Sequence, residues 1–255
     1  MLRFDCPYSF SGIPNVTNDS LEEYAIAVLR EATSDLLKIP MPLDVEKFIE
    51  YYLELELEYH KLSYGKQVLG LTAFNSGYIQ IFNDDTGEPE PLLVSAGTVV
   101  VDSSLLVRRN IPRLRFTQVH ESAHWMLHQS FFSKENGFFA NENYENQYLA
   151  AKEGRIDYSR SQKERNDLER LERQADFFAS TLLMNLHAMR IAYANFFHYY
   201  GERPRKLIRT KDEDKSFVQM LPEYIANEFN VSKRAALIRL EKLGAIVNHP
   251  MWGQQ

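Results

Sequence analysis

The chain has 255 residues, of which 44% are hydrophobic and 25% are charged, and this composition is typical of a globular protein with its own core. Its net charge of −6 argues against a protein that coats nucleic acid or an anionic membrane. The most apolar run, 91–107, is interrupted by serines, Gly97 and Asp102, so it predicts no membrane span. The single cysteine, Cys6, cannot form an intrachain disulfide, and the first residues show no signal peptide. We therefore predict a cytoplasmic protein.

The first third of the chain predicts helices followed by strands. Helical spacing of apolar residues covers 21–37, and Asp44 can cap a second helix. Residues 65–74 and 77–84 are rich in β-branched and aromatic residues, and turn-forming residues separate them. The sequence therefore predicts a β-hairpin here. A loop over 84–91 and a strand over 97–102 follow in the prediction.

Two long helices are predicted in the second half of the chain. The first covers about 113–132, and helical spacing resumes at Ser161 and continues to about residue 190. Between them, residues 133–160 are polar and show little periodicity. We predict an extended loop or an irregular insertion there.

The first of these helices carries three of the seven histidines of the chain, in the stretch FTQVHESAHWMLH. On a helix, His120 and His124 lie one turn apart and about 40° apart around the axis, so their imidazoles can bind one metal ion. Glu121 is turned about 100° away and can act on a water molecule that the metal activates. This is the H-E-x-x-H arrangement of two metal ligands and a general base. The alternative is that two histidines lie four residues apart by chance on a buried helix.

A catalytic zinc site needs a third protein ligand. His128 lies a further turn along the helix, so we predict that it supports the site or ends the helix instead of binding the metal. Cys6 is a poor candidate near the N-terminus. On the second long helix, Glu172 and Asp176 share one face, so Glu172 can bind the metal and Asp176 can accept the spare N–H of a ligand histidine. The alternative is a solvated, charged helix face.

Two stretches, RFTQVHESAHWMLH and ERQADFFASTLLM, resemble the ImmA/IrrE family of metallopeptidases. That family shows R-F-T-x-x-H-E-x-x-H-x-x-x-H, then E-x-x-A-N-x-F-A followed by L-L-M-P. The resemblance covers about residues 40–190. It implies that His120, His124 and Glu172 bind zinc and that Glu121 is the catalytic base.

The sequence departs from the family pattern in three places. Ser122 and Ala123 replace a bulky residue and a glycine, Asp176 replaces an asparagine, and Asn185 stands where proline is common. None of these changes removes a predicted ligand.

The C-terminal stretch NEFNVSKRAALIRLEKLG resembles the second half of a helix-turn-helix motif. Ser232 can cap the helix and Gly244 can end it. We expect four cationic side chains to project outward from it: Lys233, Arg234, Arg239 and Lys242. This helix can either read DNA or pack against the rest of the protein, and the acidic chain disfavours DNA.

We therefore predict an α+β fold, with a zincin-like metallopeptidase domain over 1–200 and a helical, helix-turn-helix-like segment over 216–255. The predicted function is that of a zinc-dependent endopeptidase with Zn²⁺ as cofactor and no membrane partner. By resemblance, its substrate would be a regulatory protein, a helix-turn-helix repressor of a stress or mobile-element operon. The edge of a hairpin over 66–83 can bind that substrate by strand addition. The alternatives are a non-catalytic zinc-binding interaction module and a DNA-binding regulator.

Overall fold

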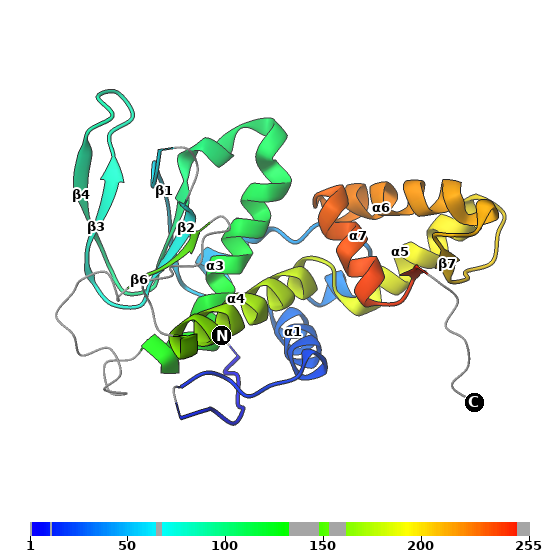
Figure 1. The fold of residues 1–255 in the computed structure, drawn as a ribbon, viewed down its shortest axis with the longest axis horizontal. Coiled ribbons are helices and arrows are strands. Elements are labelled where there is room, and N and C mark those ends of the chain that lie inside the picture. The colour runs from blue at the N-terminus through cyan, green and yellow to red at the C-terminus, as the bar shows by residue number, and fades with distance from the viewer. Residues whose placement is uncertain (1, 11, 65–67, 133–147, 153–161, 249–255) are drawn as a thin grey trace.

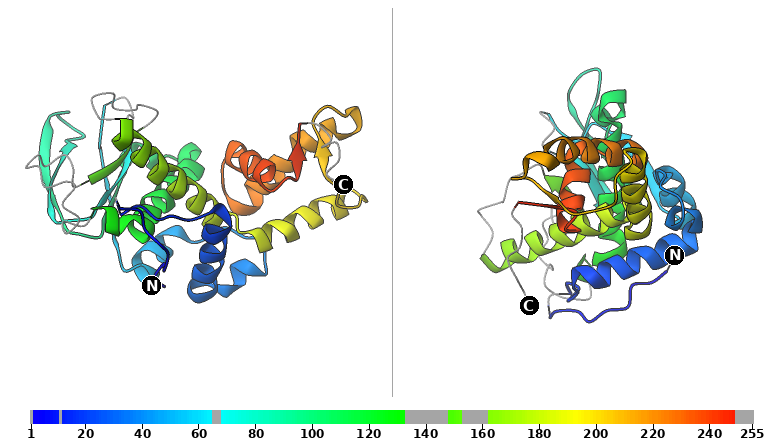
Figure 2. Two further views of the ribbon diagram at one scale, coloured as in Figure 1. Left: turned by 60° about the horizontal axis from the view of Figure 1, so that its bottom comes forward. Right: turned by 90° about the vertical axis from the view of Figure 1, so that its right-hand side faces the viewer.

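The computed structural model describes residues 2–10, 12–64, 68–132, 148–152 and 162–248, and has a mixed α+β architecture (Figure 1). Its helices are α1 (Asn18–Ala32), α2 (Val45–Lys47), α3 (Ile111–Phe132), α4 (Gln162–Leu183), α5 (Leu186–Tyr199), α6 (Lys215–Phe229) and α7 (Lys233–Lys242). Its strands are β1 (Glu56–His60), β2 (Val68–Ala73), β3 (Gly77–Phe82), β4 (Pro89–Val94), β5 (Thr98–Asp102), β6 (Tyr148–Lys152), β7 (Leu207–Ile208) and β8 (Ile246–Val247). The sheet lies at one end of the molecule and α5–α7 at the other, with α3 and α4 between them (Figures 1 and 2).

The helices α3 and α4 form the centre of the molecule and pack against each other. On α3, Val119, Ala123 and Met126 are buried in the main hydrophobic core, as the sequence predicts. On α4, Ala175 and Ala179 are fully buried. Small side chains let two helix backbones approach closely, so polar side chains on the two helices can meet.

A four-stranded sheet covers one side of α3, with the strand order β1-β5-β2-β6. The inner strand β5 is buried along its whole length and pairs with β1 in parallel and with β2 in antiparallel orientation. β2 in turn pairs antiparallel with β6. Because both neighbours of β2 are strands, its main chain has no free edge.

The predicted pairing of residues 65–74 with 77–84 is wrong. The strand β3 instead pairs with β4, from Gly77 opposite Val94 to Phe82 opposite Pro89, and the predicted loop over 84–91 is shorter because β4 begins at Pro89. The turn between β3 and β4 is stabilised by the Asn83 side chain, which accepts hydrogen bonds from the backbone N–H groups of Asp85 and Thr86. These contacts fix a hairpin one strand later than the sequence predicts.

The region 133–160, predicted as an extended loop or an irregular insertion, contains a strand. Tyr148–Lys152 forms β6 at the edge of the sheet, where the sequence predicts irregular structure. Its pairing partner β2 lies more than 70 residues earlier, so no local pattern indicates the strand. The rest of this region, and Ser161 as a helix cap, lie outside the described residues.

The helix predicted over 161–190 is two helices, α4 and α5, with a break at Met184–Asn185. The Asn185 side chain caps α5 by accepting a hydrogen bond from the Ala188 N–H at 3.0 Å. Its amide nitrogen also donates to the carbonyl of Leu36 at 2.9 Å, so both the oxygen and the nitrogen of this buried side chain are hydrogen-bonded. The first backbone N–H groups of a helix have no acceptor within that helix, and the side chain of an N-cap asparagine accepts a hydrogen bond from one of them. Asn185 therefore favours the start of a new helix.

The last helix, α7, has the predicted caps. The Ser232 hydroxyl accepts a hydrogen bond from the Ala235 N–H at 3.1 Å, and α7 ends before Gly244, whose φ is +68°. The predicted orientation of Arg239 is wrong, because its side chain is 1% exposed. It binds both carboxylate oxygens of Glu22 on α1 at 2.6 and 2.7 Å and the carbonyl of Met184 at 3.1 Å. Arg239 therefore attaches α7 to α1 and to the end of α4.

Replacing Arg239 by methionine is expected to lower the free energy of unfolding by about 3 kcal/mol or more, because Glu22 would remain largely buried without its cation. Urea denaturation of the metal-free protein would measure the change. Lys233→Met is the matched control, since Lys233 pairs with Glu223 on the surface and should cost less than about 1 kcal/mol. Equal stability losses in the two variants would contradict this account of Arg239.

One hydrophobic core extends from α1 through α3 and α4 to α5, α6 and α7. The division at residues 200–216 and the helix-turn-helix character of the C-terminal segment remain predictions. No described helix is both long and apolar enough to cross a membrane.

Candidate metal centre

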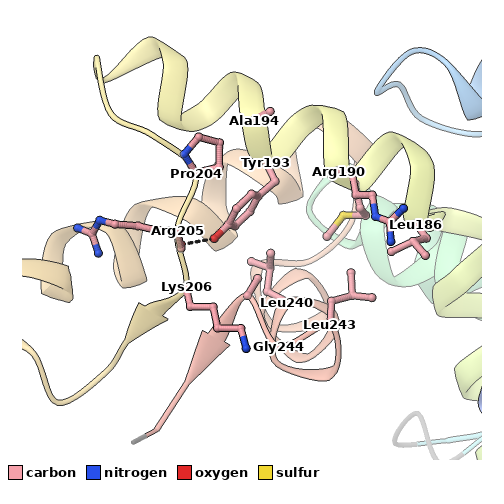
Figure 3. A pocket seen from close by; sticks show the side chains of 12 residues that line it. Leu186, Arg190, Tyr193, Ala194, Pro204, Arg205, Lys206, Leu240, Leu243 and Gly244 are labelled. Atoms are coloured by element: carbon pink, nitrogen blue, oxygen red, sulfur yellow. Dashed lines mark hydrogen bonds between the residues drawn. The ribbon is translucent and has the colours of Figure 1, made fainter. Parts of the chain in front are cut away.

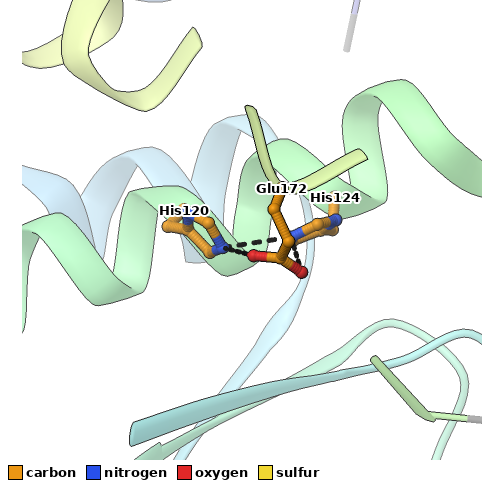
Figure 4. Close-up of side chains that lie close together, drawn as sticks. All are labelled: His120, His124 and Glu172. Carbon is orange, nitrogen blue, oxygen red and sulfur yellow. Dashed lines mark hydrogen bonds and ion pairs between the residues drawn. The ribbon is translucent and has the colours of Figure 1, made fainter. Parts of the chain in front are cut away.

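Three side chains from α3 and α4 converge in the centre of the molecule (Figure 4). His120 and His124 lie one turn apart on α3, and their Nε2 atoms are 3.1 Å apart. Glu172 reaches them from α4, with its carboxylate oxygens 3.2 Å from Nε2 of His120 and 3.6 Å from Nε2 of His124. The structure thus brings together the three residues that the sequence predicts as metal ligands.

The arrangement of these three groups suits a tetrahedral metal ion. Ligands at about 2.0–2.1 Å from a tetrahedral Zn²⁺ lie about 3.3 Å from one another. The two Nε2 atoms are 3.1 Å apart, and Glu172 places Oε2 3.2 Å from His120 and Oε1 3.6 Å from His124. One donor atom from each of the three residues lies within 4.8 Å of the other two. Both histidines are buried, whereas Glu172 is partly exposed. Two imidazoles and one carboxylate from the protein are a donor set that leaves the fourth position open for a substrate or water.

Asp176 lies next to the other nitrogen of His120, as the spacing on α4 predicts. Its Oδ1 is 3.0 Å from Nδ1 of His120, and its side chain is 58% exposed. A carboxylate at this position favours a hydrogen on Nδ1, which leaves the lone pair of Nε2 for a metal.

Charges within the cluster raise the pKa of His120 and lower the pKa of Glu172. Burial lowers the pKa of His120, but its contacts with Asp176 and Glu172 outweigh burial and raise the pKa to about 10. Burial raises the pKa of Glu172, but the two histidines outweigh it and lower the pKa. Burial lowers the pKa of His124. Without a metal, a proton on His120 thus supplies the positive charge that Glu172 faces, and metal binding would release that proton.

Glu121 is fully buried between α3 and β2. The hydroxyl of Thr72 on β2 lies 2.9 Å from Oε2 of Glu121 and 2.8 Å from the backbone carbonyl oxygen of Glu121. Thr72 therefore holds the Glu121 carboxylate against the strand. The other carboxylate oxygen, Oε1, is buried and makes no hydrogen bond with any described residue. Burial and the nearby Glu172 raise the pKa of Glu121 to about 8, although the charge of His120 opposes them. A carboxyl group with such a pKa can both accept and donate a proton near neutral pH.

Gly70 on β2 gives Glu121 the space it needs. A Cβ atom at position 70 would lie only 2.7 Å from both Cγ and Oε1 of Glu121 and 2.8 Å from the Thr117 methyl group. Any side chain here would therefore displace the carboxylate. Sequence reasoning missed both Gly70 and Thr72, because the contact between β2 and α3 is set by tertiary packing some 50 residues apart.

His128 is not part of the His120–His124–Glu172 group, but it contacts one member of it, His124. Its Nδ1 lies 2.9 Å from Nδ1 of His124, and its Nε2 lies 3.1 Å from Oε1 of Gln174 on α4. Burial lowers the pKa of His128 well below its usual value. The predicted supporting position of His128 agrees with these contacts, whereas Gln174 carries no signal in the sequence that we identified.

Other candidate residues lie outside the cluster. Cys6 is half-buried and is not part of the His–His–Glu group found among the described residues. His187 is exposed on α5. A cavity of about 400 Å³ lies between α5, the segment 204–206 and α7 (Figure 3), and it shares no residue with the metal cluster.

The fold and the cluster together define an α+β protein with a candidate metal site of the kind found in metallopeptidases. Residues 148–241 match the family model of the IrrE N-terminal-like domain, a peptidase family. The match supports the assignment of the chain to the ImmA/IrrE family of metallopeptidases, so the resemblance predicted from the two motifs is confirmed. The matched segment covers less than half of the chain; it includes Glu172 and Asp176 but begins after His124. No curated protein matched the sequence.

Proposed function

We propose that the chain is a zinc-dependent endopeptidase with a zincin-like site. The observation that supports this most is the convergence of His120, His124 and Glu172, whose donor atoms, one from each residue, all lie within 4.8 Å of one another. Beside them, Glu121 is a buried carboxyl group with a raised pKa. The single cysteine, which cannot form an intrachain disulfide, suits the cytoplasm as the place of action.

In this proposal each residue has one role. His120, His124 and Glu172 hold the metal, and Asp176 orients His120. A bound Zn²⁺ would polarise the scissile carbonyl and make an attacking water molecule more acidic. Glu121 accepts the proton of that water and passes it to the leaving amine, while Thr72 holds the carboxylate in place.

The proposed substrate, by family resemblance, is a helix-turn-helix repressor of a stress or mobile-element operon. The hairpin over 66–83, on whose edge the sequence predicts substrate binding, does not form, because β2 lies between β5 and β6 and β3 pairs with β4. Strand addition needs an outer strand. Among the described strands, β6 is the outer one beside β2, and Gly70 and Thr72 of β2 lie against Glu121. We therefore propose that β6 receives an extended segment of the substrate.

The test is incubation of the full chain with the repressor encoded beside its gene. We expect cleavage at one site, loss of cleavage with a zinc chelator, and recovery when Zn²⁺ is added back. An intact repressor after incubation with the zinc-loaded protein would support a non-catalytic zinc-binding module instead. Cleavage that is unaffected by the chelator would contradict the metal-dependent mechanism.

We do not propose a role in DNA binding. Of the four cationic side chains expected to project from α7, Arg239 is buried against Glu22. Lys242 lies over the ring of Phe177, with its amine 5.2 Å from the ring centroid, and Lys233 pairs with Glu223. The helix thus uses much of its positive charge within the protein.

A further inference from the structure

A chain of buried hydrogen bonds leads from His124 to the N-terminal segment. The Nδ1 atoms of His124 and His128 are 2.9 Å apart, and Nε2 of His128 is 3.1 Å from Oε1 of Gln174. The Gln174 amide nitrogen donates to the carbonyl of Pro14 at 2.8 Å. His124 and His128 are fully buried, and Gln174 is 7% exposed, so water does not compete strongly for these groups.

The direction of these hydrogen bonds is set at the Pro14 end. A carbonyl oxygen only accepts, so Gln174 must face Pro14 with its NH₂ group and His128 with its Oε1. The reversed amide would place two acceptors 2.8 Å apart. Oε1 also only accepts, so Nε2 of His128 must carry a hydrogen.

The same reasoning fixes the next pair. A neutral histidine with a hydrogen on Nε2 has a lone pair on Nδ1, and a charged imidazole would be costly in this fully buried position. Nδ1 of His128 therefore accepts, and Nδ1 of His124 must donate. His124 then has no hydrogen on Nε2, the atom that faces His120 and Glu172.

We propose that His128, Gln174 and the Pro14 carbonyl are positioning groups that keep His124 in the tautomer whose Nε2 lone pair faces the metal. This proposal rests on the proposed metal site. It gives the two histidine ligands different supports: His120 has the exposed carboxylate of Asp176, whereas His124 has a neutral, buried chain of hydrogen bonds. The tautomer of a metal-binding histidine is commonly set by the partner of its other nitrogen, and such partners are worth about ten- to a hundredfold in metal affinity.

Two substitutions of His128 separate the effect on the tautomer from an effect on packing. Asparagine carries an oxygen as many bonds from the main chain as Nδ1, so His128→Asn keeps an acceptor for His124. Leucine fills the space without an acceptor. In competition with a chromophoric chelator, we expect His128→Leu to bind Zn²⁺ about ten- to a hundredfold more weakly than the wild type. His128→Asn should bind more tightly than His128→Leu, and His187→Leu, on the exposed face of α5, should match the wild type.

The decisive measurement is the ¹⁵N NMR spectrum of His124 in the metal-free protein, because it reads the tautomer without metal or activity. We expect a hydrogen on Nδ1 in the wild type and in His128→Asn, and on Nε2 in His128→Leu. A wild-type His124 with its hydrogen on Nε2 would overturn the proposal even if a variant fails to fold. So would equal zinc affinity of His128→Leu and the wild type, a result that leaves the proposed peptidase function standing. Failure of the wild type to bind zinc would instead refute the proposed function, and the tautomer would still be tested.

Discussion

Glu121→Gln is expected to lower the rate of peptide-bond cleavage by about 10²–10⁴-fold, the usual contribution of a general acid–base group. The amide has the shape of the carboxylate and can still accept a hydrogen bond from Thr72, but it cannot take a proton from water. Because Glu121 is fully buried and its pKa is raised, a neutral amide should not lower the stability of the fold. Zinc content and thermal unfolding should therefore match the wild type.

The measurement is the initial cleavage rate of the repressor with equal zinc loading of both proteins. Glu169→Gln, on the exposed face of α4, removes a carboxylate without touching the site and serves as the control. A Glu121→Gln protein that retains the wild-type rate would show that another group acts as the base.

Glu172→Ala is expected to weaken zinc binding more than a hundredfold, beyond the usual ten- to hundredfold effect of residues that only orient a ligand. Glu172 supplies the only carboxylate of the His–His–Glu group found among the described residues, and two imidazoles alone leave the ion underligated. Asp176→Asn should have a smaller effect, because its amide oxygen can still accept the N–H of His120. Glu169→Ala should change nothing.

Thermal unfolding with and without Zn²⁺ gives a second measure of the same change. At a free zinc concentration about 100 times the wild-type Kd, binding stabilises the fold by about 2.7 kcal/mol, and a hundredfold weaker site would leave about 0.4 kcal/mol. The comparison within each variant removes the effect that the loss of Glu172 has on the metal-free protein, where it pairs with His120. Full zinc stabilisation in Glu172→Ala would place the third ligand elsewhere.

The parts of the site that the sequence predicts are those governed by a single helix. His120 and His124 face one way because four residues make about one turn, and Glu172 and Asp176 share a face of α4 for the same reason. The sequence therefore predicts which side chains share a face of each helix. The meeting of the two helices follows from their buried alanines and from the apolar face of α3.

The groups that surround those ligands depend on contacts that no local pattern encodes. Thr72 and Gly70 reach Glu121 because β2 lies inside the sheet, whereas the sequence places it in a hairpin. The sequence pattern of a strand does not identify the strand with which it pairs, because pairing depends on the tertiary structure. Pro14 reaches Gln174 across 160 positions of sequence.

The sequence predicts an exposed Arg239, whereas the structure buries it, for a related reason. Its helix has cations at several positions, and helical spacing alone does not tell which of them meets a carboxylate of another element. Glu22 provides that carboxylate from α1. A charged residue can be buried when it is paired with an opposite charge. The sequence of one helix does not show which residue elsewhere in the chain supplies that charge.

The contact between Glu22 and Arg239 joins residues 217 positions apart, nearly the full length of the chain. During synthesis from the N-terminus, the first helix and all the proposed metal ligands emerge well before α7 exists. Until then the Glu22 carboxylate lacks its Arg239 partner, and the main core lacks the side chains of its last helices. Docking of α7 is therefore among the last steps that a newly made chain can complete. A chain released early would differ from the mature protein at its first helix as well as at its last.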